Sequence, residues 1–127
     1  MSRLPAGPAV RLAEELLARA GCADSARPWV LRTRSGGHRS IDFAALERHV
    51  HALDLSEEAV ARIALSLATG LPIDLRAALG YLTRDHAELV MTVVACVGGH
   101  DRSGSRVRVS ADRRSVETVP PLRSWAF

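Results

Sequence analysis

The sequence contains no lysine, asparagine or glutamine, and all 17 of its basic residues are arginine. Codons for lysine and asparagine are rich in A and T, so we interpret this inventory as the mark of a very GC-rich genome. The number of arginines is therefore weak evidence for binding to nucleic acid. Their placement along the chain carries more information.

Other features are scarce, and each scarcity excludes a class of protein. The longest apolar run, Leu89 to Val97, is interrupted by Thr92 and is shorter than the roughly 18 residues that cross a bilayer. Residues 1–8 lead into a charged amphipathic stretch instead of an apolar signal core. Two cysteines, Cys22 and Cys96, cannot build a disulfide framework. We therefore expect a cytoplasmic protein without a membrane segment, in which both cysteines are thiols.

The residues that are present describe a globular protein. The chain has 127 residues, of which 47% are apolar and 24% charged, and its net charge is +3. A chain of this length buries roughly two-thirds of the surface that it exposes when unfolded, so its core needs neither metal nor disulfide. We expect residues 1–127 to form one domain without a cofactor, and residues 120–127 to be a flexible or docking tail.

Capping residues and apolar spacing predict about four or five short helices. The predicted N-terminal residues are Pro8, Asp42, Ser56, Asp74 and Thr83. The predicted C-terminal stops are Gly21, Gly70 and the pair Gly98-Gly99. The fold class that follows is mainly α, a compact bundle of short helices with a small β element.

Two regions have the alternation of strands. Residues 29–33 lie between a proline and two glycines and predict a short strand. Residues 106–109 alternate strictly and residues 115–119 more loosely, with residues 111–114 as the turn between them. The C-terminal region is therefore either a hairpin over residues 106–119 or a disordered tail.

Charge is distributed unevenly along the chain. Residues 1–40 carry a net charge of +4, residues 41–100 carry −4 and residues 101–127 carry +3. Such a layout allows the two basic arms to fold onto the acidic helices, to pair with another copy or to reach an anionic partner. Ordinary solvated surface charge is the alternative.

The segment from Ala95 to Gly104 contains the most specific motif of the chain. Its sequence, ACVGGHDRSG, has a cysteine followed after five residues by arginine and serine, and it resembles the phosphate-binding loop of cysteine-dependent protein phosphatases. In that family a thiolate lies in a cradle of backbone N–H groups while an arginine binds the phosphoryl oxygens. The resemblance implies Cys96 as nucleophile, Arg102 as phosphate ligand and Ser103 as a helper at the leaving thiolate.

The same segment has a structural interpretation. Ala95 stands where the family usually has histidine, and the residues after Gly104 alternate like a strand where the family has a helix. The alternative is a core helix that ends at Gly98-Gly99 and buries Cys96. The backbone at Cys96 decides between the two, because a helix through this residue excludes the phosphate cradle.

No metal motif is evident. His49 and His51 are two residues apart, so they point in different directions on a helix. Cys96 and His100 could reach one ion, but a closed zinc site needs four ligands. We therefore expect no metal.

A nucleic-acid hypothesis has two bases. Residues 56–69 and 74–82 have the spacing of a helix-turn-helix, but Arg76 is the only long basic side chain on its second helix. The other basis is a set of arginines in the two arms, which would contact the phosphate backbone. These residues are Arg32, Arg34, Arg39, Arg106, Arg108, Arg113 and Arg114.

The leading hypothesis is a non-enzymatic interaction protein, an accessory factor or a self-associating subunit whose partner is another protein or a second copy. Its exposed docking anchors would be aromatic, at Trp29, Trp125 and Phe127. Residues 65–99 are also similar to small proteins of actinobacteria and their phages. That resemblance implies a bacterial cytoplasmic or phage-related origin and no activity.

Overall fold

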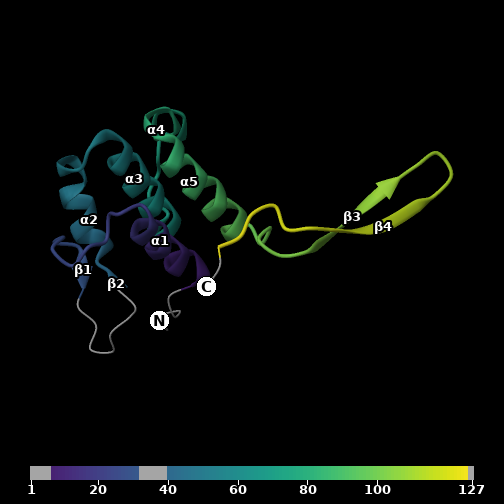
Figure 1. Cartoon of the computed structure of the whole chain (residues 1–127), viewed down its shortest axis with the longest axis horizontal. Helices are drawn as coiled ribbons and strands as arrows, with labels where there is room; N and C mark the ends of the chain where they lie inside the picture. Colours follow the sequence, from purple (N-terminus) through teal and green to yellow (C-terminus); the bar gives the residue numbers. More distant parts are fainter. Residues whose placement is uncertain (1–6, 32–39, 126–127) are drawn as a thin grey trace. The chain divides into compact units, whose positions relative to one another are not determined.

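The computed structural model describes residues 7–31 and 40–125. These residues form five α-helices and two small antiparallel sheets (Figure 1), so the prediction of a mainly α chain with a small β component is confirmed. The helices are α1 (Pro8–Arg19), α2 (Phe43–His49), α3 (Leu55–Thr69), α4 (Leu75–Tyr81) and α5 (Arg84–Val97), with a 3₁₀ turn, η1, at Val50–Ala52. The strands are β1 (Val30–Leu31), β2 (Ser40–Ile41), β3 (Gly104–Val109) and β4 (Arg114–Val119).

The contacts of the chain fall into two units, Met1–Val90 and Met91–Phe127. The first unit contains α1 to α4 and the first half of α5. The second contains the last half of α5, the β3–β4 hairpin and the C-terminal segment. Among the helices of the described segments, none is both long and apolar enough to cross a lipid bilayer.

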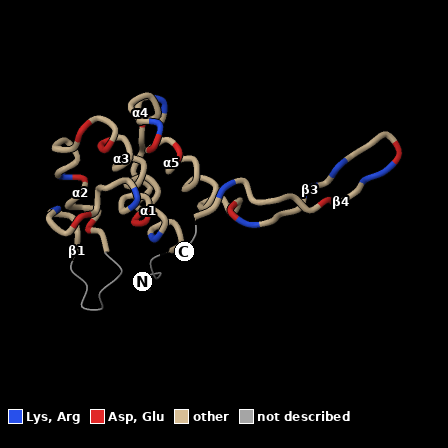
Figure 2. The backbone as a smooth tube through the Cα atoms, viewed as in Figure 1, with Lys and Arg blue, Asp and Glu red and all other residues tan. Residues whose placement is uncertain are grey.

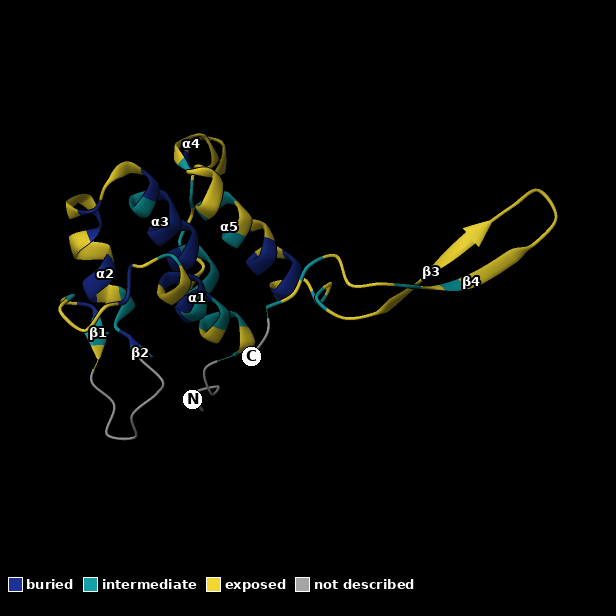
Figure 3. Ribbon diagram, viewed as in Figure 1, coloured by how far each residue is buried: buried dark blue, intermediate teal, exposed yellow. Residues whose placement is uncertain are grey.

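The core of the first unit is built around α3, which contacts α1, α2 and α4. Figure 3 shows buried residues on α1, α2 and α3. The largest fully buried side chains of this unit come from all three helices and from the loop after α1. They include Leu16, Leu17, Trp29, Leu46, Val60 and Leu65.

Most of the predicted helix ends are confirmed. The Asp42 and Asp74 carboxylates each accept a hydrogen bond at 3.1 Å, from the backbone N–H groups of Ala45 and Ala77. Gly70 ends α3 with φ +76°, a left-handed conformation that favours glycine. The two aspartate side chains satisfy N–H groups that the first turn of a helix leaves without an intrahelical partner.

The predicted start of α3 at Ser56 is wrong. Asp54 is the N-cap, and its carboxylate accepts the Glu57 N–H at 2.8 Å while the Glu57 carboxylate accepts the Asp54 N–H at 3.4 Å. This reciprocal capping box satisfies two backbone donors at once, which Ser56 could not do. Ser56 is instead a buried residue in the first turn of the helix.

The two sheets are short ribbons. In the first, Val30 pairs with Ile41 and Leu31 with Ser40, so the strand predicted near residues 29–33 is present over Val30–Leu31; residues 32 and 33 lie outside the described part. In the second, β3 and β4 form an antiparallel hairpin with Val107 opposite Val116. Of the two alternatives for the C-terminal region, the structure has the hairpin.

Candidate functional site

The β3–β4 hairpin presents two chemically different faces. Side chains alternate along a strand, and residues directly opposite each other in an antiparallel pair lie on the same face. One face, which we call the valine face, carries Ser105, Val107, Val109, Arg114, Val116 and Thr118. The other, the charged face, carries Gly104, Arg106, Arg108, Ser115, Glu117 and Val119.

The valine face is open to solvent. Val107, Val109 and Val116 are 62%, 71% and 72% exposed. Val107 and Val116 stand directly opposite each other, so their side chains make one continuous apolar surface. A two-stranded hairpin with an uncovered apolar face is marginally stable in water. This surface therefore has more to gain from a partner than the covered faces of α1 and α3.

On the charged face, one carboxylate serves two arginines. The Arg106 Nε atom pairs with Glu117 Oε1, and the Arg108 Nη1 atom lies 3.7 Å from Glu117 Oε2. Arg113 and Arg114 lie where the turn meets β4, and the Ser110 N–H closes that turn by donating to the Arg113 carbonyl at 3.0 Å. Figure 2 shows basic positions on both strands of the hairpin.

The predicted arm arginines are thus only partly brought together. Arg106, Arg108, Arg113 and Arg114 share the hairpin, whereas Arg32, Arg34 and Arg39 lie outside the described residues. Aromatic side chains are the commonest docking anchors, so the three valines of the hairpin were not predicted as docking residues. The signal was present, since valine and arginine alternate strictly over residues 106–109.

The prediction of Trp29 as an exposed docking anchor is wrong. Trp29 is 1% exposed, and its indole Nε1–H donates to the Cys22 carbonyl at 2.7 Å. The Arg27 guanidinium lies 5.5 Å from the ring centroid and covers it. A satisfied indole can be buried at little cost, and its large apolar ring then fills the core. Trp125 is half-buried, and Phe127 lies outside the described residues.

Cys96 lies inside a helix. It belongs to the last turn of α5 and is 8% exposed. The helix closes when the His100 N–H donates to the Ala95 carbonyl at 2.7 Å and the Gly99 N–H donates to the Cys96 carbonyl at 3.1 Å. The end of a helix presents carbonyl oxygens, which repel a phosphate. Of the two interpretations of this segment, the structure has the helix end.

The other residues of the phosphatase-like motif fall in the connection that follows. Arg102 and Ser103 lie between α5 and β3 and are exposed. The chain continues from them into β3, so no helix N-terminus follows the motif to supply N–H groups. The described residues therefore form no phosphate cradle at Cys96.

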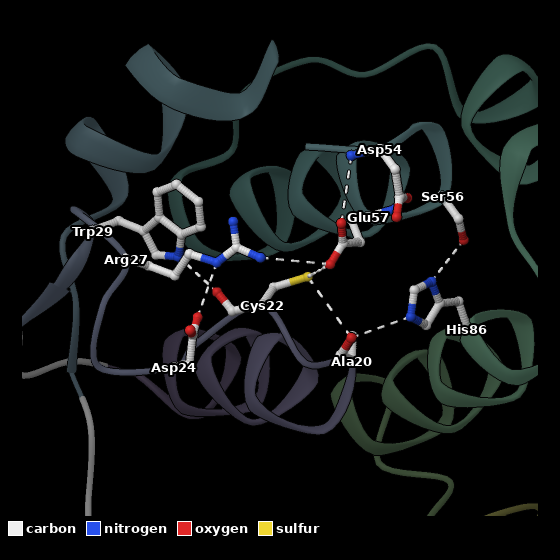
Figure 4. Close-up of polar contacts among 9 residues, drawn as sticks. All are labelled: Ala20, Cys22, Asp24, Arg27, Trp29, Asp54, Ser56, Glu57 and His86. Atoms are coloured by element: carbon white, nitrogen blue, oxygen red, sulfur yellow. Dashed lines mark hydrogen bonds and ion pairs between the residues drawn. The ribbon is translucent and has the colours of Figure 1, made fainter. Parts of the chain in front are cut away.

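A polar cluster that the sequence did not predict joins α1, α3 and α5 (Figure 4). The His86 Nδ1 atom lies 2.6 Å from the Ser56 Oγ atom, and His86 Nε2 lies 3.2 Å from the Ala20 carbonyl oxygen. A carbonyl only accepts, so Nε2 carries the hydrogen and the Ser56 hydroxyl of a neutral pair donates to Nδ1. The Ser56 oxygen in turn accepts the Thr83 N–H at 2.9 Å.

The contacts of this serine–histidine pair indicate a structural role and not a catalytic one. A nucleophilic serine needs its oxygen free to approach a substrate carbonyl. Here Ser56 is 7% exposed, and its hydroxyl already donates to one group and accepts from another. The pair fixes the start of α5 against the start of α3 and the end of α1.

Cys22 lies beside the same helix ends, and its thiol is unreactive. Its Sγ atom is 4.0 Å from the Glu57 Oε2 atom and 3.9 Å from the Ala20 carbonyl oxygen. Burial, reinforced by the negative charge of Glu57, raises the pKa of the Cys22 thiol to about 12. Because the thiolate is the nucleophile and the metal ligand, a protonated Cys22 performs neither role at neutral pH.

Within the part of the chain that the structure describes, no group of three or more His, Cys, Asp and Glu side chains could hold a metal ion. Comparison with models of protein families, with curated proteins and with solved structures gives no match to this chain. The function of the chain is therefore inferred from its own geometry.

Proposed function

We propose that this protein is a non-enzymatic interaction protein that binds a protein partner through the valine face of its β3–β4 hairpin. The observation that carries the proposal is the exposure of three valines on one face of a regular hairpin. Burial of a valine side chain contributes about 1.5 to 3 kcal/mol. A surface that covers all three would stabilise both the complex and the hairpin.

The second unit exposes further apolar surface on α5. Met91, Val94 and Val97 are 54%, 58% and 40% exposed. Their spacing of three residues places them along one side of the helix. An apolar stripe of this kind favours a protein surface as partner over the anionic backbone of a nucleic acid.

Nucleic-acid binding is the second candidate. The observation that favours it is the presence of four arginines on one hairpin, a shape that fits a DNA groove. Two of them, Arg106 and Arg108, already share the Glu117 carboxylate, and Asp112 lies in the turn beside Arg113. These acidic groups weaken the attraction of the hairpin for phosphates, so the protein partner is the better supported proposal.

Photo-crosslinking separates the two candidates. A photoreactive amino acid replaces Val109 on the valine face or, as the matched control, Arg108 on the charged face, and the chain is irradiated in the cells that make it. We expect a discrete adduct from position 109, several-fold stronger than that from position 108, because a side chain on the valine face lies inside the interface. The adduct should be destroyed by protease and resist nuclease.

Two outcomes would contradict the proposal. A nuclease-sensitive adduct, strongest from position 108, would support nucleic-acid binding through the charged face. Equal or absent adducts from both positions would mean that the hairpin is not a binding element.

A further inference from the structure

The outer edge of β4 is unpaired in the described part of the chain, where β4 pairs with β3 alone. The Ser110–Arg113 hydrogen bond marks one hydrogen-bonded pair of the hairpin, and such pairs alternate with pairs whose main-chain groups point outward. Counting back from the turn, Val107–Val116 and Ser105–Thr118 are non-hydrogen-bonded pairs, whose main-chain groups point outward. The N–H and C=O groups of Arg114, Val116 and Thr118 therefore point away from β3, toward the open edge.

We propose that the hairpin also binds a second copy of this chain, edge to edge through β4. The two β4 strands run antiparallel about a two-fold axis at Val116 and form one sheet in the order β3-β4-β4-β3. This inference goes beyond the proposed function, because the pairing uses the edge of β4 and leaves the valine face free for the protein partner. Strand addition of this kind uses the open edge for main-chain hydrogen bonds and the side chains for register.

The register follows from the positions of the outward groups. With the axis at Val116, Arg114 stands opposite the partner's Thr118, and the outward groups of both strands make about six main-chain hydrogen bonds. An axis at Glu117 would place two carboxylates directly opposite each other, which is destabilising. An axis at Ser115 would run the turn of one hairpin against the end of the other strand. The axis at Val116 avoids both conflicts.

Charge selects the β4 edge over the β3 edge. Arg106 and Arg108 flank Val107 on β3. An antiparallel pair of β3 strands centred on Val107 places Arg106 of each copy opposite Arg108 of the other. Centring on either arginine places that residue opposite itself. Like charges directly opposite are destabilising, so each of these β3 pairings is disfavoured, whereas β4 pairing about Val116 opposes no like charges.

The pairing also joins the exposed valines of two copies on one face of the sheet. In the proposed sheet, Val107 and Val116 of both copies form one apolar row across all strands. The basic turns lie at opposite ends of the ladder, because the β4 strands are antiparallel. Pro120 follows β4 directly and has no N–H group, so it ends the edge. An isologous interface of this kind is the commonest basis of a homodimer.

Opposite charges at Thr118 test the register. Thr118→Glu places a carboxylate opposite Arg114 of the other copy, twice in each dimer, and Thr118→Arg places two arginines there. From the strength of cross-strand charge pairs, we expect Thr118→Glu to lower the dimer Kd by about 2- to 30-fold and Thr118→Arg to raise it by a similar factor. Comparing the two variants cancels the loss of threonine. The measurement is sedimentation equilibrium of purified protein at about 0.1 M salt, where charges more than about 10 Å apart are largely screened.

Ser105 supplies the matched control. It lies opposite Thr118 in the same hairpin and on the same face, but on β3. Glutamate or arginine at position 105 should change the Kd by less than about twofold, since one strand separates it from the partner's Arg114. Circular dichroism of each variant shows whether the fold is retained.

Three results would overturn the inference. A reversed order of the two Thr118 variants would place the axis elsewhere, an effect at Ser105 equal to that at Thr118 would place the interface on β3, and a wild-type chain that stays monomeric would remove the dimer. The proposed function is tested separately. If Val109 crosslinks to a different protein while the purified chain remains monomeric, the proposed function is retained and the dimer is ruled out.

Discussion

At the scale of single residues, Ser56 shows how a correct pattern can be assigned to the wrong role. Local sequence favours it as a cap because it is a serine that precedes two glutamates. The capping role belongs to Asp54, and the Ser56 hydroxyl binds Thr83 and His86, 27 and 30 positions away. Contacts across such separations leave no local signal, so sequence reasoning could not find this cluster.

Ser56→Ala should lower the free energy of unfolding by about 1 to 3 kcal/mol, because it leaves the partly buried Thr83 N–H and the His86 ring nitrogen without their partner. Denaturant unfolding measures the difference. Ser66→Ala, on the same helix and outside this cluster, is the control and should cost less than about 0.5 kcal/mol. Equal losses in the two variants would show that the cluster contributes nothing particular.

The burial of Trp29 also depends on a contact that the local sequence does not reveal. A tryptophan in a chain with five aromatic residues invites a binding role, and nothing adjacent in sequence shows that the Cys22 carbonyl accepts its indole N–H. The position of Cys96 was more predictable. The glycine pair after it indicated a helix end, which α5 has, although the phosphatase-like spacing indicated a loop.

At the scale of elements, the sequence predicted most of the boundaries. Helix caps and the alternation of hairpin strands are local features, so Asp42, Asp74 and residues 106–119 could be placed without tertiary information. The chemistry of the hairpin faces was equally local. Its importance for binding could not be predicted from the sequence, because it depends on how exposed the valine side chains are. Only the structure shows that exposure.

The capping box of α3 predicts a pH dependence. Hydrogen bonds from Glu57, led by its backbone N–H, hold the pKa of Asp54 below its usual range. A carboxylate whose pKa is lowered on folding stabilises the protein above its unfolded pKa, and this stabilisation is lost as the pH falls through the folded pKa. Asp54→Ala should therefore lower the Tm at pH 7, and the deficit should shrink in acid.

Asp54→Asn provides the control for this prediction. Asparagine caps helices about as well as aspartate but has no titrating charge. The variant should keep most of the Tm at pH 7 and lose the part of the acid dependence that Asp54 contributes. A Tm deficit of Asp54→Ala that is the same in acid as at pH 7 would contradict the assignment.

At the scale of the whole molecule, the chain combines a helical unit with ordinary internal packing and a C-terminal unit whose apolar surface is largely uncovered. In the first unit, buried apolar side chains of α1, α2 and α3 form a packed core. In the second, the hairpin leaves both an apolar face and an open strand edge. Conformational stability therefore belongs to the first unit, and we assign association to the second.

The uneven distribution of arginine fits this division of roles. Part of the basic charge of the C-terminal arm lies on the charged face, where Glu117 neutralises it in part. On the valine face, Arg114 is the cation that the proposed sheet places opposite the partner's Thr118. In the proposed dimer, Arg106 and Arg108 disfavour the pairing of β3 edges, a role that the total number of arginines in the sequence does not reveal.

Amide hydrogen exchange of the hairpin, measured by NMR at low and high protein concentration, tests the central claim most directly. At high concentration the N–H groups of Arg114, Val116 and Thr118 should exchange at least about tenfold more slowly, because they become hydrogen-bonded across the two copies. The outward N–H groups of Val107 and Val109 on β3 should not change. Exchange at β4 that is independent of concentration, or protection that appears on β3 instead, would contradict the account.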